Sequence, residues 1–118
     1  MQEESKKIDT EKDFVQEDPR KLRARGCVYG AFVGDAAGAL LEFVGIHNIN
    51  EKSVEYALSL GAGGRMNVGP GQITDDSEMA MCLLNAAYDD TEHLNLDLIQ
   101  YNFGLWLKSP PFDIGYTT

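Results

Sequence analysis

Several features that would place this chain in a large class of proteins are absent from its sequence. No run of about 18 apolar residues is present, so we expect no transmembrane helix. The opening residues, MQEESKKIDTEKDF, lack the apolar segment of a secretory signal, so we expect no cleaved leader. The two cysteines, Cys27 and Cys82, lie in apolar segments without a spacing typical of a disulfide. They predict free, buried thiols in a reducing compartment, the cytoplasm.

Basic side chains are also scarce. Ten Lys and Arg stand against nineteen Asp and Glu, which leaves a net charge of −9. This balance disfavours nucleic acids and anionic membrane surfaces as partners, and it is compatible with a cation site. Four of the basic residues form the segment RKLRAR at 20–25. We interpret this segment as the solvated first turns of a helix, with a phosphate or partner contact as the alternative.

Histidine is rare as well, since the chain has only His47 and His93. We interpret both as surface or turn residues. No cluster of His and Cys indicates a zinc site, and no Ser-His-Asp arrangement is visible. These absences leave oxygen ligands and carboxylates as the chemistry that the chain can offer.

What is present predicts one all-α domain, or part of one, in 118 residues. Residues 1–18 are polar and charged, and we expect a disordered tail there. The folded part is then 19–118. Asp18 and Pro19 are a helix start, with Asp at the N-cap and Pro at the first position, and the helical pattern continues to about Phe43.

Inside this first helix, Gly26, Gly30, Gly34 and Gly38 recur every four residues. Each glycine costs about 1 kcal/mol relative to alanine in a helix interior, so another interaction must offset the penalty. Tight packing of another helix on the smooth face would do so, either alone or together with a ligand-facing role. Asp35 lies in the middle of this apolar stretch, and a lone carboxylate there must find hydrogen-bond donors or a cation.

The remaining chain alternates between helices and loops. Residues 53–60 predict a short helix, although a strand is the alternative. The segment GAGGRMNVGPGQ at 61–72 is a long loop, and it is not a phosphate-binding P-loop because no Gly-Lys-Ser/Thr follows. Apolar periodicity predicts helices over 77–88 and about 97–107, the second starting at Asn95 or Asp97 and ending at a Pro-Pro pair.

The strongest chemical signal is Thr74-Asp75-Asp76, where the glycine loop becomes a helix. The ordinary interpretation is helix capping, because Thr and Asp are favoured at helix N-termini. The alternative is a cation site, since three oxygen ligands on consecutive residues suit a hard ion such as Mg²⁺ or Mn²⁺. A divalent ion would also remove the repulsion between the adjacent carboxylates. Asp113 by itself is typical of a turn.

Three segments in order resemble the ADP-ribosylglycohydrolase family: GCVYGAFVGDAAGALLEF, GQITDDSEMAMCLL and SPPFDIGYTT. This family covers the dinitrogenase-reductase-activating glycohydrolases and the ADP-ribosyl-acceptor hydrolases, and the resemblance spans about 26–118. It implies a compact all-α fold of many helices around two Mg²⁺ or Mn²⁺ ions. It also implies hydrolysis of the bond between ADP-ribose and an acceptor. The substrate would be an ADP-ribosylated protein or a small molecule that contains ADP-ribose.

The resemblance assigns roles to particular residues. Thr74, Asp75 and Asp76 match the metal ligands of the family. Glu42 matches a glutamate at the metal site and substrate entrance, which makes it a candidate catalytic residue.

Asp113, the second candidate catalytic residue, and Gly115 match the loop along the bound ribose. Gly69 and Gly71 would lie near the diphosphate, and Asp35 would support the fold around the site.

Members of the family are longer and carry a second motif of the type Asp-x-Asp-Thr near their C-terminus. No such motif follows Asp113 in this chain, and Asp89-Asp90-Thr91 is interpreted as a helix-end turn. We therefore expect the N-terminal portion of the fold, with half of the metal site and little or no activity of its own. The alternative is a non-catalytic protein of the same fold, regulatory or structural in the manner of a crystallin.

Overall fold

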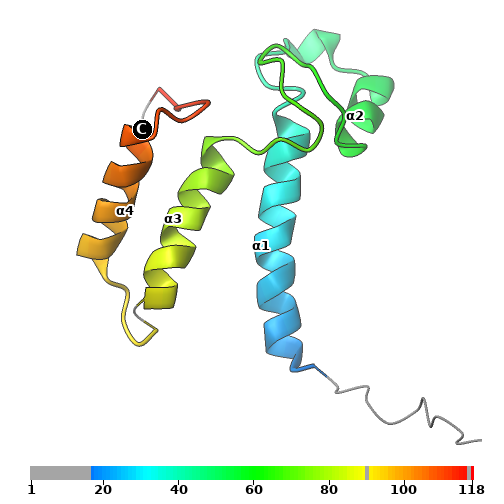
Figure 1. Ribbon diagram of the computed structural model, residues 1–118. Coiled ribbons are helices and arrows are strands. Elements are labelled where there is room, and N and C mark those ends of the chain that lie inside the picture. Colours follow the sequence, from blue (N-terminus) through cyan, green and yellow to red (C-terminus); the bar gives the residue numbers. More distant parts are fainter. Residues whose placement is uncertain (1–16, 90, 117) are drawn as a thin grey trace, which may run out of the picture.

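A computed structural model describes residues 17–89, 91–116 and 118 of the chain, and these residues form helices joined by turns and loops (Figure 1). The elements in chain order are α1 (Pro19–Gly38), the 3₁₀ helix η1 (Ile46–Asn48), α2 (Glu51–Leu58), α3 (Asp75–Asp89) and α4 (Leu96–Lys108). The all-α prediction is confirmed. None of the described helices is long and apolar enough to cross a membrane.

The predicted start of α1 is confirmed, and its predicted end is wrong. The Asp18 carboxylate accepts a hydrogen bond of 2.9 Å from the backbone N–H of Arg20, and Pro19 occupies the first helical position. The helix ends at Gly38 and is followed by turns, instead of continuing to Phe43. Phe43 has a φ of 58°, a left-handed conformation that stops a helix and redirects the chain.

The glycine face of α1 does not receive another helix in this part of the chain. An added Cβ at Gly26, Gly30, Gly34 or Gly38 would meet no described atom within 4 Å, beyond the helix's own backbone. No described helix packs on these four glycines, so tight packing on this face stays a prediction. Gly34 and Gly38 line a cleft between α1 and the start of α3.

Beyond the end of α1, α2 and the glycine loop enclose a small apolar core. Asn50 and Ser53 form a capping box, in which the Asn50 side chain accepts from the Ser53 N–H at 3.1 Å, so the helical alternative for this segment is the correct one. The buried core consists of Ala39, Leu40, Ala57 and Val68, with Leu41 and Met66 packed against it.

Gly64 shows why the loop beside this core needs glycine. Its φ is +68°, and a Cβ there would lie 2.9 Å from the carbonyl oxygen of Leu40. Both the left-handed backbone and the close approach exclude a larger side chain. The loop can therefore lie directly on the turn that follows α1.

The helices α3 and α4 form an antiparallel pair on the other side of α1 (Figure 1). Asn95 is the N-cap of α4 and accepts from the Leu98 N–H at 3.0 Å, which decides between the two predicted starts. Trp106 is 8% exposed, and its indole Nε1–H donates to Glu78 Oε2 at 2.6 Å. Asn102 Nδ2 donates to the backbone oxygen of Cys82 at 3.2 Å.

Both cysteines are free, as predicted, but only one is shielded. Cys82 is half-buried, and burial together with the charge of Glu78 raises the pKa of its thiol. Cys27 is exposed, so the prediction that it is buried is wrong. It lies on a part of α1 that no described element covers.

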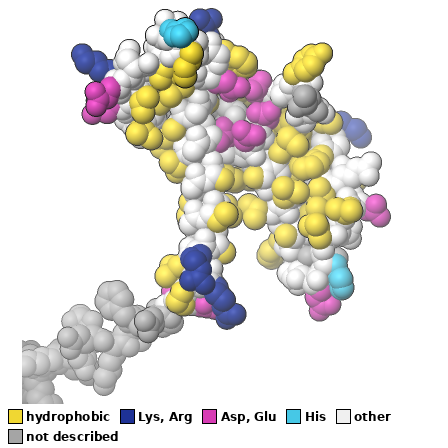
Figure 2. Space-filling view, turned by 180° about the vertical axis from the view of Figure 1, so that it is seen from behind, with side chains coloured by type: hydrophobic (Ala, Val, Ile, Leu, Met, Phe, Trp, Pro, Cys, Tyr) yellow, Lys and Arg dark blue, Asp and Glu magenta, His cyan; other side chains and the backbone are white. Residues whose placement is uncertain are grey.

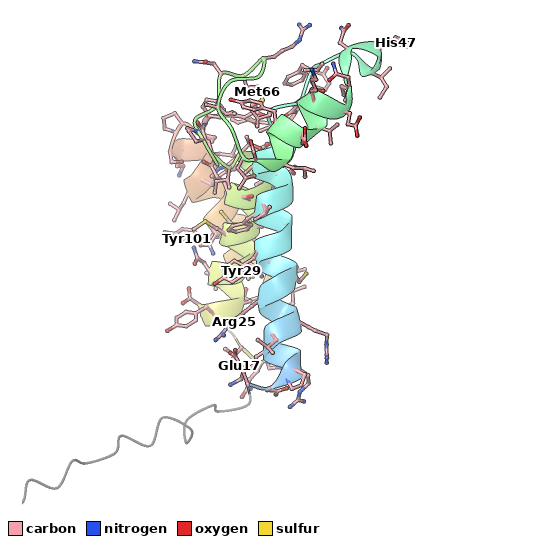
Figure 3. The ribbon with its side chains drawn as sticks, turned by 90° about the vertical axis from the view of Figure 1, so that its right-hand side faces the viewer. Glu17, Arg25, Tyr29, His47, Met66 and Tyr101 are labelled. Atoms are coloured by element: carbon pink, nitrogen blue, oxygen red, sulfur yellow. The ribbon has the colours of Figure 1, made fainter. Side chains whose placement is uncertain are left out.

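The basic side chains at the start of α1 and both histidines are exposed to solvent. The RKLRAR segment is exposed at the start of α1, where Figure 2 shows the basic side chains together. Arg20 pairs with Asp18 at 3.0 Å, and Arg25 pairs with Glu17 (Figure 3). Of the predicted tail, residues 1–16 lie outside the described residues. His47 and His93 are exposed, and His47 points outward from η1 (Figure 3).

The direction of the helices decides where the site can form. The chain runs along α1, returns along α3 and runs parallel to α1 again in α4 (Figure 1). The end of α1, the start of α3 and the loop after α4 therefore lie at the same end of the molecule. These are the three segments that carry the predicted acidic residues.

Candidate functional site

Acidic side chains gather where the end of α1, the start of α3 and the loop after α4 meet (Figure 2). One cleft of about 620 Å³ is lined by residues of α1 and α3, and a second of about 570 Å³ is lined by α3 and the loop after α4. Both clefts are lined by Glu42, Asp75 and Asp76. Asp113 and Gly115 line the second cleft, so the structure brings five predicted site residues together.

Thr74 also lines the first cleft, and it is held there by Asp35. Asp35 Oδ2 accepts from the backbone N–H of Thr74 at 2.9 Å and from that of Ser77 at 3.2 Å, and Oδ1 accepts from the Thr74 hydroxyl at 2.5 Å. Thr74 and Ser77 are 3% and 2% exposed. The carboxylate of α1 therefore caps the N-terminus of α3 and ties the two helices together.

These hydrogen bonds decide the charge of Asp35. Burial raises the pKa of its carboxyl, but hydrogen bonds from Ser77 and Thr74 outweigh burial and leave the pKa below the ordinary value. The Ser77 hydroxyl lies close enough to Asp35 to help lower the pKa of that carboxyl, although it makes no hydrogen bond of good geometry with any described residue. Asp35 is therefore an ionised acceptor at neutral pH.

The pKa of the Glu42 carboxyl is shifted in the opposite direction from that of Asp35. Partial burial raises the pKa of its carboxyl, and the negative charges of Asp113, Asp75, Asp76 and Asp35 raise it further. None of the described residues that line the two clefts is Lys or Arg. The repulsion is therefore not relieved by a basic side chain, and a cation in the cleft would relieve it.

A backbone hydrogen bond attaches the loop after α4 to α3. The N–H of Gly115 donates to Asp75 Oδ2 at 2.8 Å. A Cβ at position 115 would lie 3.3 Å from that same oxygen and 3.2 Å from Thr118 Oγ1, so a side chain there would crowd both. Gly115 is forty positions away from Asp75 in the chain, and this contact brings the loop that carries Asp113 to the first turn of α3.

Gly69 and Gly71 lie in the glycine loop, outside the two acidic clefts. The N–H of Gly71 donates to the Leu60 carbonyl oxygen at 3.0 Å, and the N–H of Gly69 donates to Gln72 Oε1 at 2.8 Å. Neither glycine lines an acidic cleft. Their contacts shape the loop beside the apolar core, and their role in substrate binding stays a prediction.

The donor set fits a hard cation in its chemistry, since every polar side chain at the cleft offers oxygen. The described side chains do not form a complete metal site, because no three His, Cys, Asp or Glu side chains among them come close enough together to hold an ion. Thr74, Asp75 and Asp76 are therefore fit to supply part of a coordination shell.

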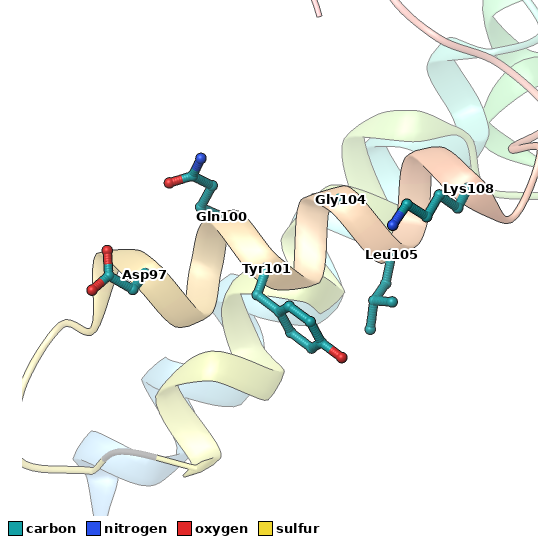
Figure 4. A pocket seen from close by; sticks show the side chains of 6 residues that line it. All are labelled: Asp97, Gln100, Tyr101, Gly104, Leu105 and Lys108. Carbon is teal, nitrogen blue, oxygen red and sulfur yellow. The ribbon is translucent and has the colours of Figure 1, made fainter.

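Two features of the structure were not predicted from the sequence. One is the Trp106–Glu78 hydrogen bond, for which the sequence offers no signal. The other is a hollow of about 300 Å³ along α4 (Figure 4). Its lining comes from a single helix and contains no predicted site residue: Asp97, Gln100, Tyr101, Gly104, Leu105 and Lys108. It is a groove between neighbouring side chains of one helix, and the acidic clefts remain the candidate site.

Comparison with known proteins shows which family the chain resembles. The model of the ADP-ribosylglycohydrolase family matches residues 16–118. The ADP-ribosyl-[dinitrogen reductase] glycohydrolase of Rhodospirillum rubrum is 41% identical over 98 residues, which cover 80% of this chain and 32% of that protein. The ADP-ribosylarginine hydrolase Tri1 of Pseudomonas putida is 30% identical over 102 residues, 81% of this chain and 26% of Tri1.

The corresponding Tri1 of Serratia proteamaculans is 28% identical over 118 residues, 94% of this chain and 30% of that protein. The chain thus spans about a third of the length of the curated relatives that it matches.

Proposed function

The chain belongs to the ADP-ribosylglycohydrolase family, and from this premise we propose that it contributes to the hydrolysis of the bond between ADP-ribose and an acceptor. One observation carries the proposal. Carboxylates from three separate segments, represented by Glu42, Asp75 and Asp113, line one cleft without a basic residue among its described lining. The names of the relatives support an ADP-ribosylated protein as the substrate, with arginine as one acceptor.

We assign Thr74, Asp75 and Asp76 to the binding of Mg²⁺ or Mn²⁺, with two ions in a complete site. Such ions polarise substrate oxygens and neutralise charge. Carboxylates of the chain itself would stabilise positive charge and accept a proton at this cleft. Glu42 and Asp113 line the second cleft, and the negative charge of these carboxylates would stabilise an oxocarbenium-like transition state there. Glu42, whose pKa is raised, is suited to accept a proton from the attacking water.

The Gly115 loop would help to orient the substrate. Its backbone N–H holds Asp75, so the loop and the first turn of α3 form one wall of the second cleft. Since the chain spans about a third of its relatives, we propose that it supplies one part of the site and that further ligands come from outside these residues.

Calorimetric titration of the 118-residue chain with MnCl₂ and MgCl₂ tests the cation site. We expect weak binding that is lost in the double variant Asp75→Asn/Asp76→Asn, because these two carboxylates are the charged ligands in the proposed set. Asp97→Asn is the matched control, since Asp97 also lies in the first turn of a helix but outside the clefts. Unchanged affinity in the double variant would contradict the assignment.

A chimaera tests the contribution to hydrolysis. The 98 matched residues of the Rhodospirillum rubrum glycohydrolase are replaced by the corresponding residues of this chain, and release of ADP-ribose is measured. We expect release that disappears with Asp75→Asn. A folded chimaera that binds Mn²⁺ and releases no ADP-ribose would instead favour the non-catalytic alternative.

A further inference from the structure

The Thr74 hydroxyl makes an unusually short contact with Asp35. A threonine hydroxyl has one proton and two lone pairs, and its proton rotates toward the best acceptor. Thr74 Oγ1 lies 2.5 Å from Asp35 Oδ1, which is the separation of a charge-assisted bond between a hydroxyl and a carboxylate. In this bond the Thr74 hydroxyl is the donor and the Asp35 carboxylate oxygen is the acceptor. What remains on Thr74 Oγ1 is lone pairs alone.

This arrangement reverses the usual behaviour of a threonine at a helix start. An N-cap hydroxyl normally accepts from the N–H two or three residues further on, which here means Asp76 or Ser77. The N–H of Ser77 instead donates to Asp35 Oδ2 at 3.2 Å. If Thr74 capped its own helix, a lone pair would be consumed and its proton would be free to point into the cleft. Asp35, from another helix, takes over the capping role.

The same carboxylate also holds the backbone of Thr74, whose N–H donates to Oδ2 at 2.9 Å. Both the main chain and the side chain of Thr74 are thus fixed by one group. Thr74 lines the cleft that Glu42, Asp75 and Asp76 share. A hydroxyl that presented its proton there would oppose a cation, whereas one that presents lone pairs attracts it.

We propose that Asp35 is a positioning residue, which holds the proton of the Thr74 hydroxyl and so presents that oxygen to a divalent cation as a pure acceptor. The inference rests on the proposed function, and it adds a residue that acts through another. Asp35 is not itself well placed as a ligand, since one of its oxygens is occupied by the Thr74 hydroxyl and the other by two N–H groups.

A double-mutant cycle on Mn²⁺ affinity tests the proposal with Asp35→Asn, Thr74→Val and the combination. Asparagine keeps the size of the side chain, but its NH₂ group can donate to Thr74 and turn the hydroxyl proton toward the cleft. We expect each single variant to weaken Mn²⁺ binding by roughly 10–100-fold, the usual effect of removing a group that orients a ligand. The double variant should bind no more weakly than Thr74→Val alone.

Additive losses in the cycle would overturn the proposal, because they would mean that Asp35 acts independently of the hydroxyl. Thr74→Ser is the conservative control and should retain binding when Asp35 is present, but should not restore binding when Asp35→Asn is present. Asp97→Asn controls for loss of one negative charge at a helix start. Circular dichroism establishes that each variant is folded.

A measurement without metal separates this inference from the proposed function. Scalar couplings in the wild-type chain should report one Thr74 χ1 rotamer, with slow exchange of the Thr74 and Ser77 amide protons. In Asp35→Asn the rotamer should average and both amides should exchange faster. Rotamer averaging in the wild-type chain would overturn the inference. A fixed rotamer in a chain that binds neither Mn²⁺ nor Mg²⁺ would overturn the proposed cation site and leave the orientation of the hydroxyl standing.

Discussion

Two regions flank the upper end of α1, and they are held together in different ways. On one side, α2 and the glycine loop bury small apolar residues such as Ala57 and Val68 against Ala39 and Leu40. On the other side, polar contacts to carboxylates join α3 to α1 through Asp35, to the loop after α4 through Asp75, and to α4 through Glu78. The acidic clefts form on the second side. Apolar packing thus builds a support, and directional hydrogen bonds place the chemical groups.

The glycine loop belongs to the apolar side of α1, although the acidic motif follows it directly in the sequence. The family resemblance predicts that the loop lies near the substrate diphosphate and that the motif binds metal. In the structure the loop packs beside the apolar core, and its Gly69 and Gly71 line neither cleft. Two segments that are adjacent in the sequence can therefore pack on different sides of α1.

Breaking the apolar side should have the largest effect on stability. Leu40 is 5% exposed, so Leu40→Ala removes buried methyl groups and leaves a cavity, which lowers the free energy of unfolding by about 2–5 kcal/mol. Thermal denaturation followed by circular dichroism measures the loss. Leu58→Ala, at a side chain that is 70% exposed, is the control and should change stability by less than about 0.5 kcal/mol. Equal losses in the two variants would show that this core does not support the fold.

Breaking the polar side should cost less and act locally. Trp106→Phe removes the donor to Glu78 Oε2 and leaves a half-buried carboxylate unpaired, with an expected loss of about 1–3 kcal/mol. Amide hydrogen exchange should accelerate in α3 and α4 and stay unchanged at the Gly63–Val68 bridge of the apolar side. Glu78→Gln, which retains an acceptor oxygen, is the control. Faster exchange on both sides would mean that the two regions unfold as one unit.

The smallest effect is expected at Glu42, and its sign depends on pH. Because folding raises the pKa of this carboxyl above 4.5, the native state is favoured while Glu42 is protonated, and the benefit is lost as pH rises through the raised pKa. Glu42→Gln should therefore increase thermal stability at pH 7 and have little effect below the ordinary pKa of 4.5. The gain should stay under about 1 kcal/mol, since the side chain is exposed to solvent.

The matched control for Glu42 is Glu55→Gln, an exposed glutamate on α2 outside the clefts. It removes the same charge from the chain without touching the acidic cluster. An equal gain in both variants would assign the effect to net charge. A decrease for Glu42→Gln at pH 7 would contradict the repulsion that defines this side of the molecule.

Much of the fold follows from local sequence. The starts of α1 and α4 lie within a few residues of their capping side chains, Asp18 and Asn95, so short-range hydrogen bonds decide them. Thr74, Asp75 and Asp76 are likewise a local motif. Neighbouring oxygen donors at a helix start are compatible with helix capping and with a cation site, and the partners of these residues are not readable from the motif.

The all-α class, the start of α1 and the oxygen-rich motif were thus determined by the sequence alone, because each depends on residues a few positions apart. The tertiary structure decided the partners: Asp35 on Thr74, Gly115 on Asp75, and Cys27 left in solvent. These contacts depend on which faces of distant helices meet, and the spacing of glycines along α1 does not specify a neighbour. The scarcity of basic residues acquires its meaning only there, where carboxylates from three segments share a cleft.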